Sequence, residues 1–234
     1  MNATELYRAG RFAEAVQALS AELRDNPADT KRRTFLFELL SFAGEYDRAG
    51  KQLDILAREG PQTEMGTLVY RGAIQAEIQR RELFRAKNFP EPSGEPTAAA
   101  AGTLNGKPFE SIEDADPRIG ARLEVFAAGN YIWVPFGHIA SIQFSPPKKL
   151  RDLLWISAVV RLGPDMKGKD LGHVLLPAIS PFSSQHPDEA VRLGRQTVWT
   201  EEDGEEVPFG QKLLLVDGEE FPLLEAEEIQ FGSA

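Results

Sequence analysis

The sequence contains no cysteine among its 234 residues. This absence excludes a disulfide framework, a zinc–thiolate site and a thiol nucleophile, and it suits a reducing compartment, so we expect the cytoplasm. Long hydrophobic runs are also missing, because stretches such as Ala158–Val160 and Leu213–Val216 are far too short to cross a bilayer. The first residues lack the basic-then-apolar pattern of a signal peptide. We therefore expect neither membrane insertion nor secretion by the general route.

Residues suited to catalysis or metal binding are few. His138, His173 and His186 have no second ligand at metal-binding spacing, and we expect each to be structural or solvated. No hydrolase elbow, Walker loop or dinucleotide fingerprint is present. Ser183 and Ser184 lie close to His186, but neighbouring positions do not establish a nucleophile and its base. The sequence therefore predicts no enzymatic activity, no cofactor and no metal.

Charge is distributed unevenly along the chain. The net charge is −10, and it arises in residues 91–234, which carry 12 Lys/Arg against 23 Asp/Glu, whereas residues 1–90 are nearly balanced. An acidic surface repels phosphate backbones, so nucleic-acid binding is disfavoured there. We interpret the acidic runs at 201–206 as a solubilised hairpin tip rather than a cation site. The basic stretch Pro146–Arg151 is the least ordinary surface of this half, although we expect it to be a solvated connection between strands.

An internal repeat is the sharpest pattern in the sequence. The segment 9–15, Ala-Gly-Arg-Phe-Ala-Glu-Ala, recurs at 43–49 as Ala-Gly-Glu-Tyr-Asp-Arg-Ala, an offset of 34 residues. The glycine permits a tight turn between paired helices, the aromatic residue plugs the hairpin, and the small alanine lets the helices approach. These features resemble the tetratricopeptide (TPR) repeat. They predict two helical hairpins over residues 1 to about 61, with a shortened first helix.

The remaining pattern divides the chain into further parts. A long helix at Met65–Phe89 would close the exposed end of the stack. Residues 91–104 are rich in Pro, Gly and Ala and predict a linker between a helical domain at 1–90 and a second domain at 105–234. The second domain shows near-alternating apolar residues and hairpin turns, which predict a mostly antiparallel β domain, curled into a partial barrel. The expected fold class is α+β. Strands are expected at 122–126, 131–135, 139–144, 154–161, 172–176, 196–200, 212–216 and 228–231, and a short helix at 188–193.

Several blocks together resemble the ImpE/TagJ family of accessory proteins in bacterial type VI secretion. In the first half they are Phe35–Leu40 and Lys51–Asp54. In the second half they include Trp133–Phe136, Leu150–Trp155 and Arg192–Thr197. The resemblance implies a non-enzymatic adaptor. Its partners would be the small sheath subunit TssB, the sheath-disassembling ATPase ClpV, or both.

The repeat positions predict where such a partner would bind. TPR stacks bind a helix or an extended peptide on a concave face formed by the first helix of each repeat. Two alternatives remain open: an enzymatic or small-molecule-binding β domain near Trp133 and Trp155, and a self-assembling structural subunit. The oligomeric state is left open. The predicted protein-binding residues are Thr4, Tyr7, Arg8, Lys31, Thr34, Glu38 and Ser41.

Overall fold

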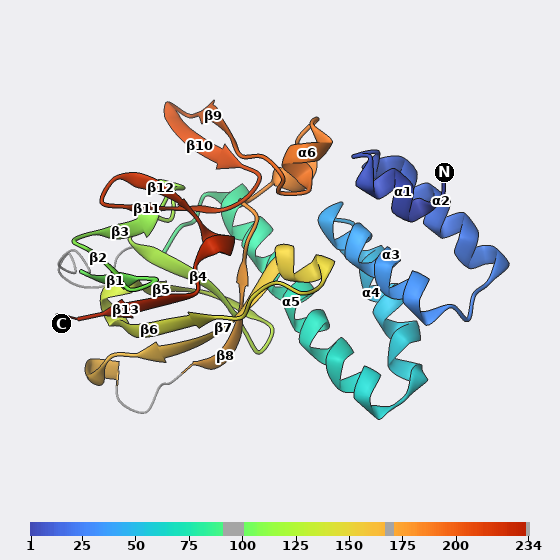
Figure 1. The fold of residues 1–234 in the computed structure, drawn as a ribbon, viewed down its shortest axis with the longest axis horizontal. Helices are drawn as coiled ribbons and strands as arrows, with labels where there is room; N and C mark the ends of the chain where they lie inside the picture. The colour runs from blue at the N-terminus through green and yellow to red at the C-terminus, as the bar shows by residue number, and fades with distance from the viewer. Residues whose placement is uncertain (91–100, 167–170, 233–234) are drawn as a thin grey trace.

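The protein is described here by a computed structural model that covers residues 1–90, 101–166 and 171–232. A helical half and a β half lie side by side, and helix α5 runs between them (Figure 1). This arrangement confirms the predicted α+β class with an N-terminal helical part and an antiparallel β part. The predicted linker, 91–104, falls mostly outside the described residues, and its last three residues form a strand.

The helical half contains the two predicted hairpins. Gly10 and Gly44 make their turns with φ of +77° and +68°, a backbone conformation that glycine adopts without strain. After each turn, Ala15 and Ala49 are completely buried, so the paired helices approach closely. The first helix is short, as expected. The helices are α1 (Ala3–Arg8), α2 (Phe12–Asp25), α3 (Thr30–Phe42), α4 (Tyr46–Leu56) and α5 (Pro61–Ala86).

Local sequence signals explain where these helices start. Asn2 and Glu5 form a capping box at α1, in which each side chain accepts a hydrogen bond from the other's backbone N–H. The carboxylate of Asp29 caps α3 by accepting from the backbone of Arg32 at 2.9 Å. Helix α5 begins at Pro61, four residues before the expected start, because proline suits the first helical position.

The β half contains thirteen strands in the described residues, and every pairing is antiparallel. Eight strands form one sheet in the order β2-β1-β13-β6-β7-β8-β4-β5, three form a sheet β12-β11-β3, and β9 and β10 form a hairpin of their own. A short helix, α6 (Glu189–Arg192), precedes that hairpin, as predicted. The strands are β1 (Gly102–Leu104), β2 (Lys107–Phe109), β3 (Ile112–Asp114), β4 (Arg122–Ala127), β5 (Asn130–Pro135), β6 (Ile139–Phe144), β7 (Trp155–Leu162), β8 (Gly172–Pro177), β9 (Val198–Glu202), β10 (Glu205–Phe209), β11 (Leu213–Val216), β12 (Glu219–Pro222) and β13 (Glu228–Phe231).

Two-residue turns join four of the hairpins. Both turn residues have positive φ at 105–106, 128–129, 203–204 and 217–218, as type I′ turns require. Three of these turns are predicted from Ala-Gly and Asp-Gly pairs. The fourth, Asn105–Gly106, and its strands β1 and β2 are missed: β1 lies inside the predicted linker, and the first predicted strand starts only at residue 122.

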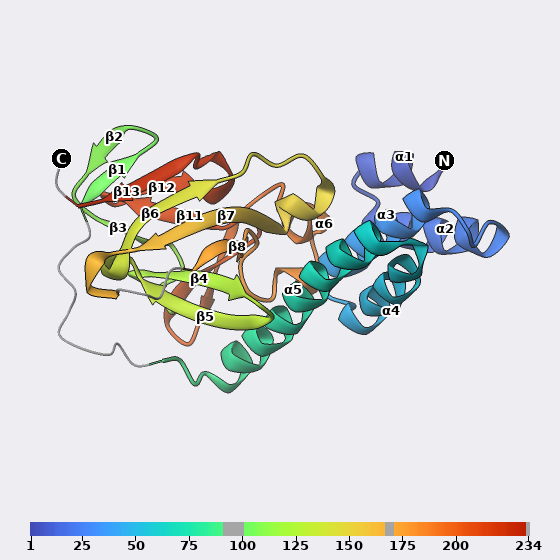
Figure 2. The ribbon, with the colours of Figure 1, turned by 90° about the horizontal axis from the view of Figure 1, so that it is seen from below.

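The hydrophobic core crosses the boundary between the two halves. Trp155 of β7 is 1% exposed and stacks on Tyr70 of α5, with ring centroids 6.1 Å apart. Together with Phe126 and Leu154 it belongs to the cluster that fills the helical hairpins. A second cluster lies between the large sheet and the β3-β11-β12 sheet. Figure 2 shows α5 running along β4 and β5, so this helix serves both halves.

Candidate protein-binding groove and the buried junction behind it

A surface groove lies where the first repeat meets the β half. It measures about 450 Å³. Its walls come from α1, from α3 and from the loop that leads into the 3-10 turn η3 (Leu150–Leu153). Apolar surface in the groove is supplied by Tyr7, Phe35, Leu150 and Leu153. Tyr7 and Phe35 meet edge to face at 5.8 Å, so the aromatic wall is built across the two repeats.

The rim of the groove is basic. Arg8, Lys148 and Lys149 line it and are exposed, and within the described residues none of them makes an ion pair. The two lysines are held in place through their backbone, because both N–H groups donate to Asp152 Oδ2 at 2.9 Å. The ammonium groups thus stay free for a partner. An apolar wall with a cationic rim suits an amphipathic segment that carries acidic residues.

The structure divides the predicted binding residues into two sets. Thr4, Tyr7 and Arg8 of α1 line the groove. On α3, Lys31 is exposed and Thr34 is half-buried, and neither lines it. Glu38 and Ser41 are 7% and 1% exposed and point into the protein's own interior. Of the predicted binding residues, those of the first repeat therefore lie at the groove, and the second repeat contributes Phe35 instead of the predicted positions.

Glu38 is covered by the β half itself. Its Oε1 accepts a hydrogen bond from Arg151 Nη1 at 2.7 Å, and the Arg151 guanidinium also lies 4.7 Å from the ring centre of Tyr70. Burial raises the pKa of the Glu38 carboxyl, and Arg151 opposes that rise. The basic stretch Pro146–Arg151 thus has two roles, with Arg151 facing inward and the two lysines facing the groove.

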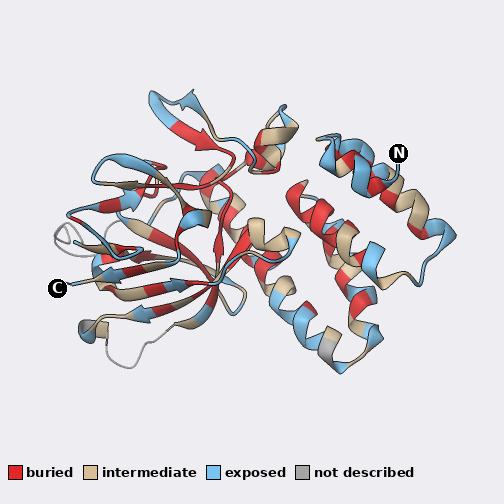
Figure 3. Cartoon of the chain, viewed as in Figure 1, coloured by how far each residue is buried: buried red, intermediate tan, exposed pale blue. Residues whose placement is uncertain are grey.

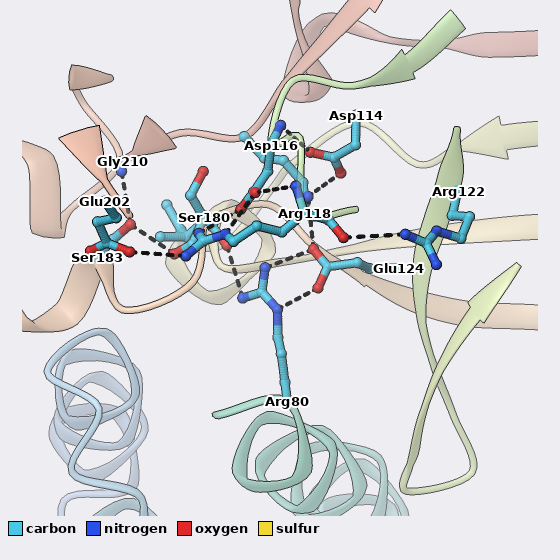
Figure 4. A network of polar contacts seen from close by, with 12 residues as sticks. Arg80, Asp114, Asp116, Arg118, Arg122, Glu124, Ser180, Ser183, Glu202 and Gly210 are labelled. Atoms are coloured by element: carbon cyan, nitrogen blue, oxygen red, sulfur yellow. Dashed lines mark hydrogen bonds and ion pairs between the residues drawn. The ribbon is translucent and has the colours of Figure 1, made fainter. Parts of the chain in front are cut away.

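Behind the groove, a network of buried charges fastens α5 to the large sheet (Figure 4). Arg80 donates two hydrogen bonds to Glu124 of β4, both of 2.7 Å, and a third to the carbonyl of Ile179 at 3.0 Å. Lys212 lies 2.7 Å from the second Glu124 oxygen and also pairs with Asp114. All four charged side chains are at most 4% exposed. The contact between Arg80 and Glu124 is bidentate, and its two hydrogen bonds fix the orientation of one side chain relative to the other.

The protonation states in this network differ sharply. Burial alone would raise the pKa of Glu124, but the cations Arg80 and Lys212 hold it at about 2. Burial raises the pKa of Asp114 to about 6 against the opposing pull of Lys212. Carboxyls with separated pKa values can mark an acid–base pair. Neither carboxyl lines any of the grooves described for this structure, and both are paired with buried cations.

The two tryptophans that suggested an enzymatic alternative are both packed against other side chains of the protein. Trp155 donates its indole N–H to Glu77 at 3.1 Å inside the core. Trp133 is stacked on Phe89, 5.8 Å between centroids, and the guanidinium of Arg122 lies 4.3 Å from its ring centre. Within the described residues, no group of three or more His, Asp or Glu could hold a metal ion. The surroundings of Trp155, where the sequence left a ligand site open as an alternative, are thus filled by the protein's own side chains.

A larger groove of about 790 Å³ lies beside the β9–β10 hairpin. Phe84, Phe182 and Phe209 supply its apolar surface, and Arg118 and Lys87 supply positive charge. Two of its cations are engaged, because Arg118 pairs with Glu202 at 3.1 Å and Lys87 pairs with Asp203, and Arg85 lines the groove as well. The acidic hairpin predicted as a solubilised tip is therefore partly neutralised by its neighbours.

Sequence reasoning missed the groove lysines as binding residues and missed the buried network. Lys148 and Lys149 were noticed as a basic stretch, but nothing in the sequence places them beside α1. Glu124 had a usable signal, because it stands in the middle of the apolar strand Arg122–Ala127. A charge at such a position requires a buried partner. Its partner Arg80, on a helix 44 residues away, could not be identified from spacing.

Comparison with known proteins identifies the family of the chain. A model of the ImpE protein family matches residues 106–230, more than half of its length. The chain belongs to the ImpE family. This confirms the resemblance predicted from its sequence blocks.

One relative of this ImpE-family chain and one solved structure of the same fold extend the match to its full length. The chain is 32% identical to the type VI secretion system accessory component TagJ of Pseudomonas aeruginosa PAO1, over 99% of this chain and 91% of TagJ. The crystal structure of protein VPA1032 from Vibrio parahaemolyticus superimposes with a TM-score of 0.84, covering 99% of this chain and 98% of that one. At 20% identity, the latter supports the fold alone. No described helix of this ImpE-family chain is long and apolar enough to span a membrane.

Proposed function

We propose that this protein is a non-enzymatic, cytoplasmic adaptor of a type VI secretion system, and that it binds TssB, ClpV or both through the groove beside α1. The system is suggested by the name of its relative TagJ. The binding surface is suggested by one observation: three predicted residues of α1 meet two lysines of the β half at an apolar groove.

The groove specifies the chemistry of the segment it would hold. An amphipathic helix could place apolar side chains against Tyr7, Phe35 and Leu153 and acidic side chains toward Lys148 and Lys149. A groove of this size buries little area, so we expect a dissociation constant on the order of 1 µM for one site. Repeated sites along a sheath polymer would raise the effective affinity.

The proposal is tested with the full chain and purified TssB and ClpV in a surface-based binding assay. The variant Arg8→Glu/Lys148→Glu/Lys149→Glu should weaken binding at least 10-fold, and binding by the natural chain should fall as salt rises. The matched control is Arg24→Glu/Lys51→Glu/Lys107→Glu, which reverses three exposed charges away from the groove. Failure of the natural chain to bind either protein, or equal losses in both variants, would reject the proposal.

A second candidate function is a small-molecule site in the groove beside the β9–β10 hairpin. It is favoured by the volume of about 790 Å³ and by the aromatic lining. A fluorescence-based screen against metabolite mixtures, followed by Phe209→Ala, tests it. If no compound binds, or if Phe209→Ala leaves binding intact, the site does not serve this function.

A further inference from the structure

A small, partly open cavity lies at the junction of the two halves and shares Phe182 with the groove beside the β9–β10 hairpin. The space open to the centre of a water molecule is about 30 Å³. One water needs about 10–15 Å³ by this measure, so the cavity has room for more than a single water. Its walls come from α3, α4 and α5 on one side, and from the segment Ile179–Ser184 and α6 on the other.

Two polar atoms at this cavity have no partner among the described residues. They are Ser180 Oγ and Arg192 Nε, each buried from solvent. Ser180 as a whole is 3% exposed. Its neighbour Ser183 is satisfied, because its hydroxyl donates to the Ser180 carbonyl at 2.7 Å and accepts from Gly210 N–H at 2.8 Å (Figure 4). A buried hydroxyl and a buried guanidinium N–H without partners are unfavourable unless something binds them.

The cavity also has an excess of positive charge. Arg80, Arg81 and Arg192 line it, and Arg80 is neutralised by Glu124 behind it. Arg81 donates to the Gly44 carbonyl at 3.1 Å and to Ser184 Oγ at 2.7 Å, and neither acceptor carries a charge. Arg192 rests 4.9 Å from the ring centre of Phe12. Within the described ranges, no carboxylate pairs with Arg81 or Arg192.

The one carboxyl in the cavity wall does little to offset that charge. Glu77 accepts the indole N–H of Trp155 and lies 3.8 Å from Arg80. Burial raises the pKa of this carboxyl, which favours its neutral form. The side chains of Arg81, Arg192 and Ser180 therefore line a cavity in whose described wall Glu77 is the carboxyl. Guanidinium and hydroxyl donors are the groups that bind oxyanions most directly.

We propose that this cavity binds a small free oxyanion, such as inorganic phosphate, sulfate or a simple carboxylate, through Ser180, Arg81 and Arg192. The small volume, about 30 Å³, suits a small ion. Because Arg81 comes from α5 and Ser180 and Arg192 come from the β half, the ion would join the two halves. This proposal is independent of the partner groove.

The test uses calorimetric titration and thermal unfolding of the full chain, with sodium phosphate, sulfate or acetate added against sodium chloride of equal ionic strength. We expect saturable binding of at least one oxyanion with one site per chain and a rise in the unfolding temperature. Comparing phosphate and sulfate with acetate shows whether the cavity prefers a tetrahedral oxyanion or a carboxylate. If chloride produces the same shift as every oxyanion, or if no saturable binding occurs, the proposal is overturned.

Two variants connect the binding to the cavity. Ser180→Ala removes an unpartnered hydroxyl, so it should fold and should weaken oxyanion binding about 10-fold, and Arg192→Gln should weaken it at least as much. The controls are Ser20→Ala, whose hydroxyl is bound to the Val16 carbonyl, and Arg195→Gln, whose guanidinium covers Tyr7 instead. Should Arg192→Gln fail to fold, Ser180→Ala alone decides. Binding unchanged by Ser180→Ala, or lost equally in the controls, would refute the assignment.

Discussion

Equivalent positions of the two repeats have different environments. In the first repeat Thr4 is exposed and Tyr7 is half-buried, whereas 34 residues later Glu38 and Ser41 are 7% and 1% exposed. The β half covers the second repeat and leaves the first accessible on that face, as the exposure along α1, α2 and α3 shows (Figure 3). A repeat pattern therefore specifies the hairpin, while its neighbours decide which face remains available for binding.

The turn glycines offer the largest test of this difference. Alanine at Gly44 would place its Cβ 2.0 Å from Arg81 Nη2, whereas at Gly10 the nearest atom is 3.9 Å away. Both substitutions strain the positive-φ backbone, by about 1–2 kcal/mol. Gly44→Ala also displaces Arg81, so we expect a total loss of about 3–4 kcal/mol in the free energy of unfolding. Urea denaturation measures the free energy of unfolding of both variants. Equal losses would mean that Arg81 does not restrict the space at Gly44.

Removing the cation that covers the second repeat should have the next largest effect. Arg151→Ala leaves Glu38 buried without its partner, which we expect to cost about 3 kcal/mol at pH 7. The Glu38 pKa is already raised, so a buried Glu38 favours the protonated form, and its unfavourable contribution appears as pH rises through that pKa. The loss in Arg151→Ala should therefore shrink when unfolding is measured at pH 4.

The control for this comparison is Lys31→Ala, which removes an exposed cation from α3, the helix that carries Glu38. It should leave the urea midpoint nearly unchanged at both pH values. A destabilisation of Arg151→Ala that stays constant from pH 7 to pH 4 would show that lost packing, and not the buried carboxyl, accounts for the effect.

The first repeat is attached to the β half through the start of α2. Glu189 accepts hydrogen bonds from the backbone N–H groups of Phe12 and Ala13, at 2.6 and 3.0 Å, and so caps a helix from another part of the chain. Glu189→Ala should cost about 1–2 kcal/mol, and Glu189→Gln less, because the amide keeps an acceptor. Hydrogen exchange should accelerate in the first turn of α2 and not in α4. Faster exchange in both helices would mean that the repeats open together.

The smallest effect is expected where the repeats are alike. Arg11 pairs with Glu14 at 2.5 Å, and at the matching positions Glu45 pairs with Arg48, with the charges exchanged. Both pairs are exposed, so Arg11→Gln and Arg48→Gln should each leave the unfolding temperature within experimental error. A clear loss in one variant alone would reveal a further difference between the repeats.

The elements that sequence could predict are those with a local cause. The hairpin turns follow from glycines that need positive φ, and β6 and β13 are predicted at the bounds that the structure shows, because their apolar residues alternate. Strands β10 and β12 are missed, since each is short, begins with two glutamates and contains a proline. Each is instead fixed by its partner strand across an Asp-Gly turn.

The candidate site required contacts between distant segments. Thr4, Tyr7 and Arg8 were identified from repeat positions alone, and the structure places them in one groove. The same reasoning chose Glu38 and Ser41, but it could not foresee that Arg151 and the β half cover them. Lys148 and Lys149 join the groove through tertiary packing, which leaves no periodic signal in the sequence.

The long helix α5 has a mechanical consequence. With 26 residues and about 1.5 Å of rise per residue, it is a rod about 39 Å long. Its first turns support the repeats, and its far end reaches Phe84 beside the β9–β10 hairpin. The bidentate ion pair between Arg80 and Glu124 opposes rotation of α5 about its own axis. Because α5 packs on α4 of the second repeat and on β4 and β5 of the sheet, a rotation of the repeats relative to the sheet would have to break the Arg80–Glu124 ion pair or bend this helix.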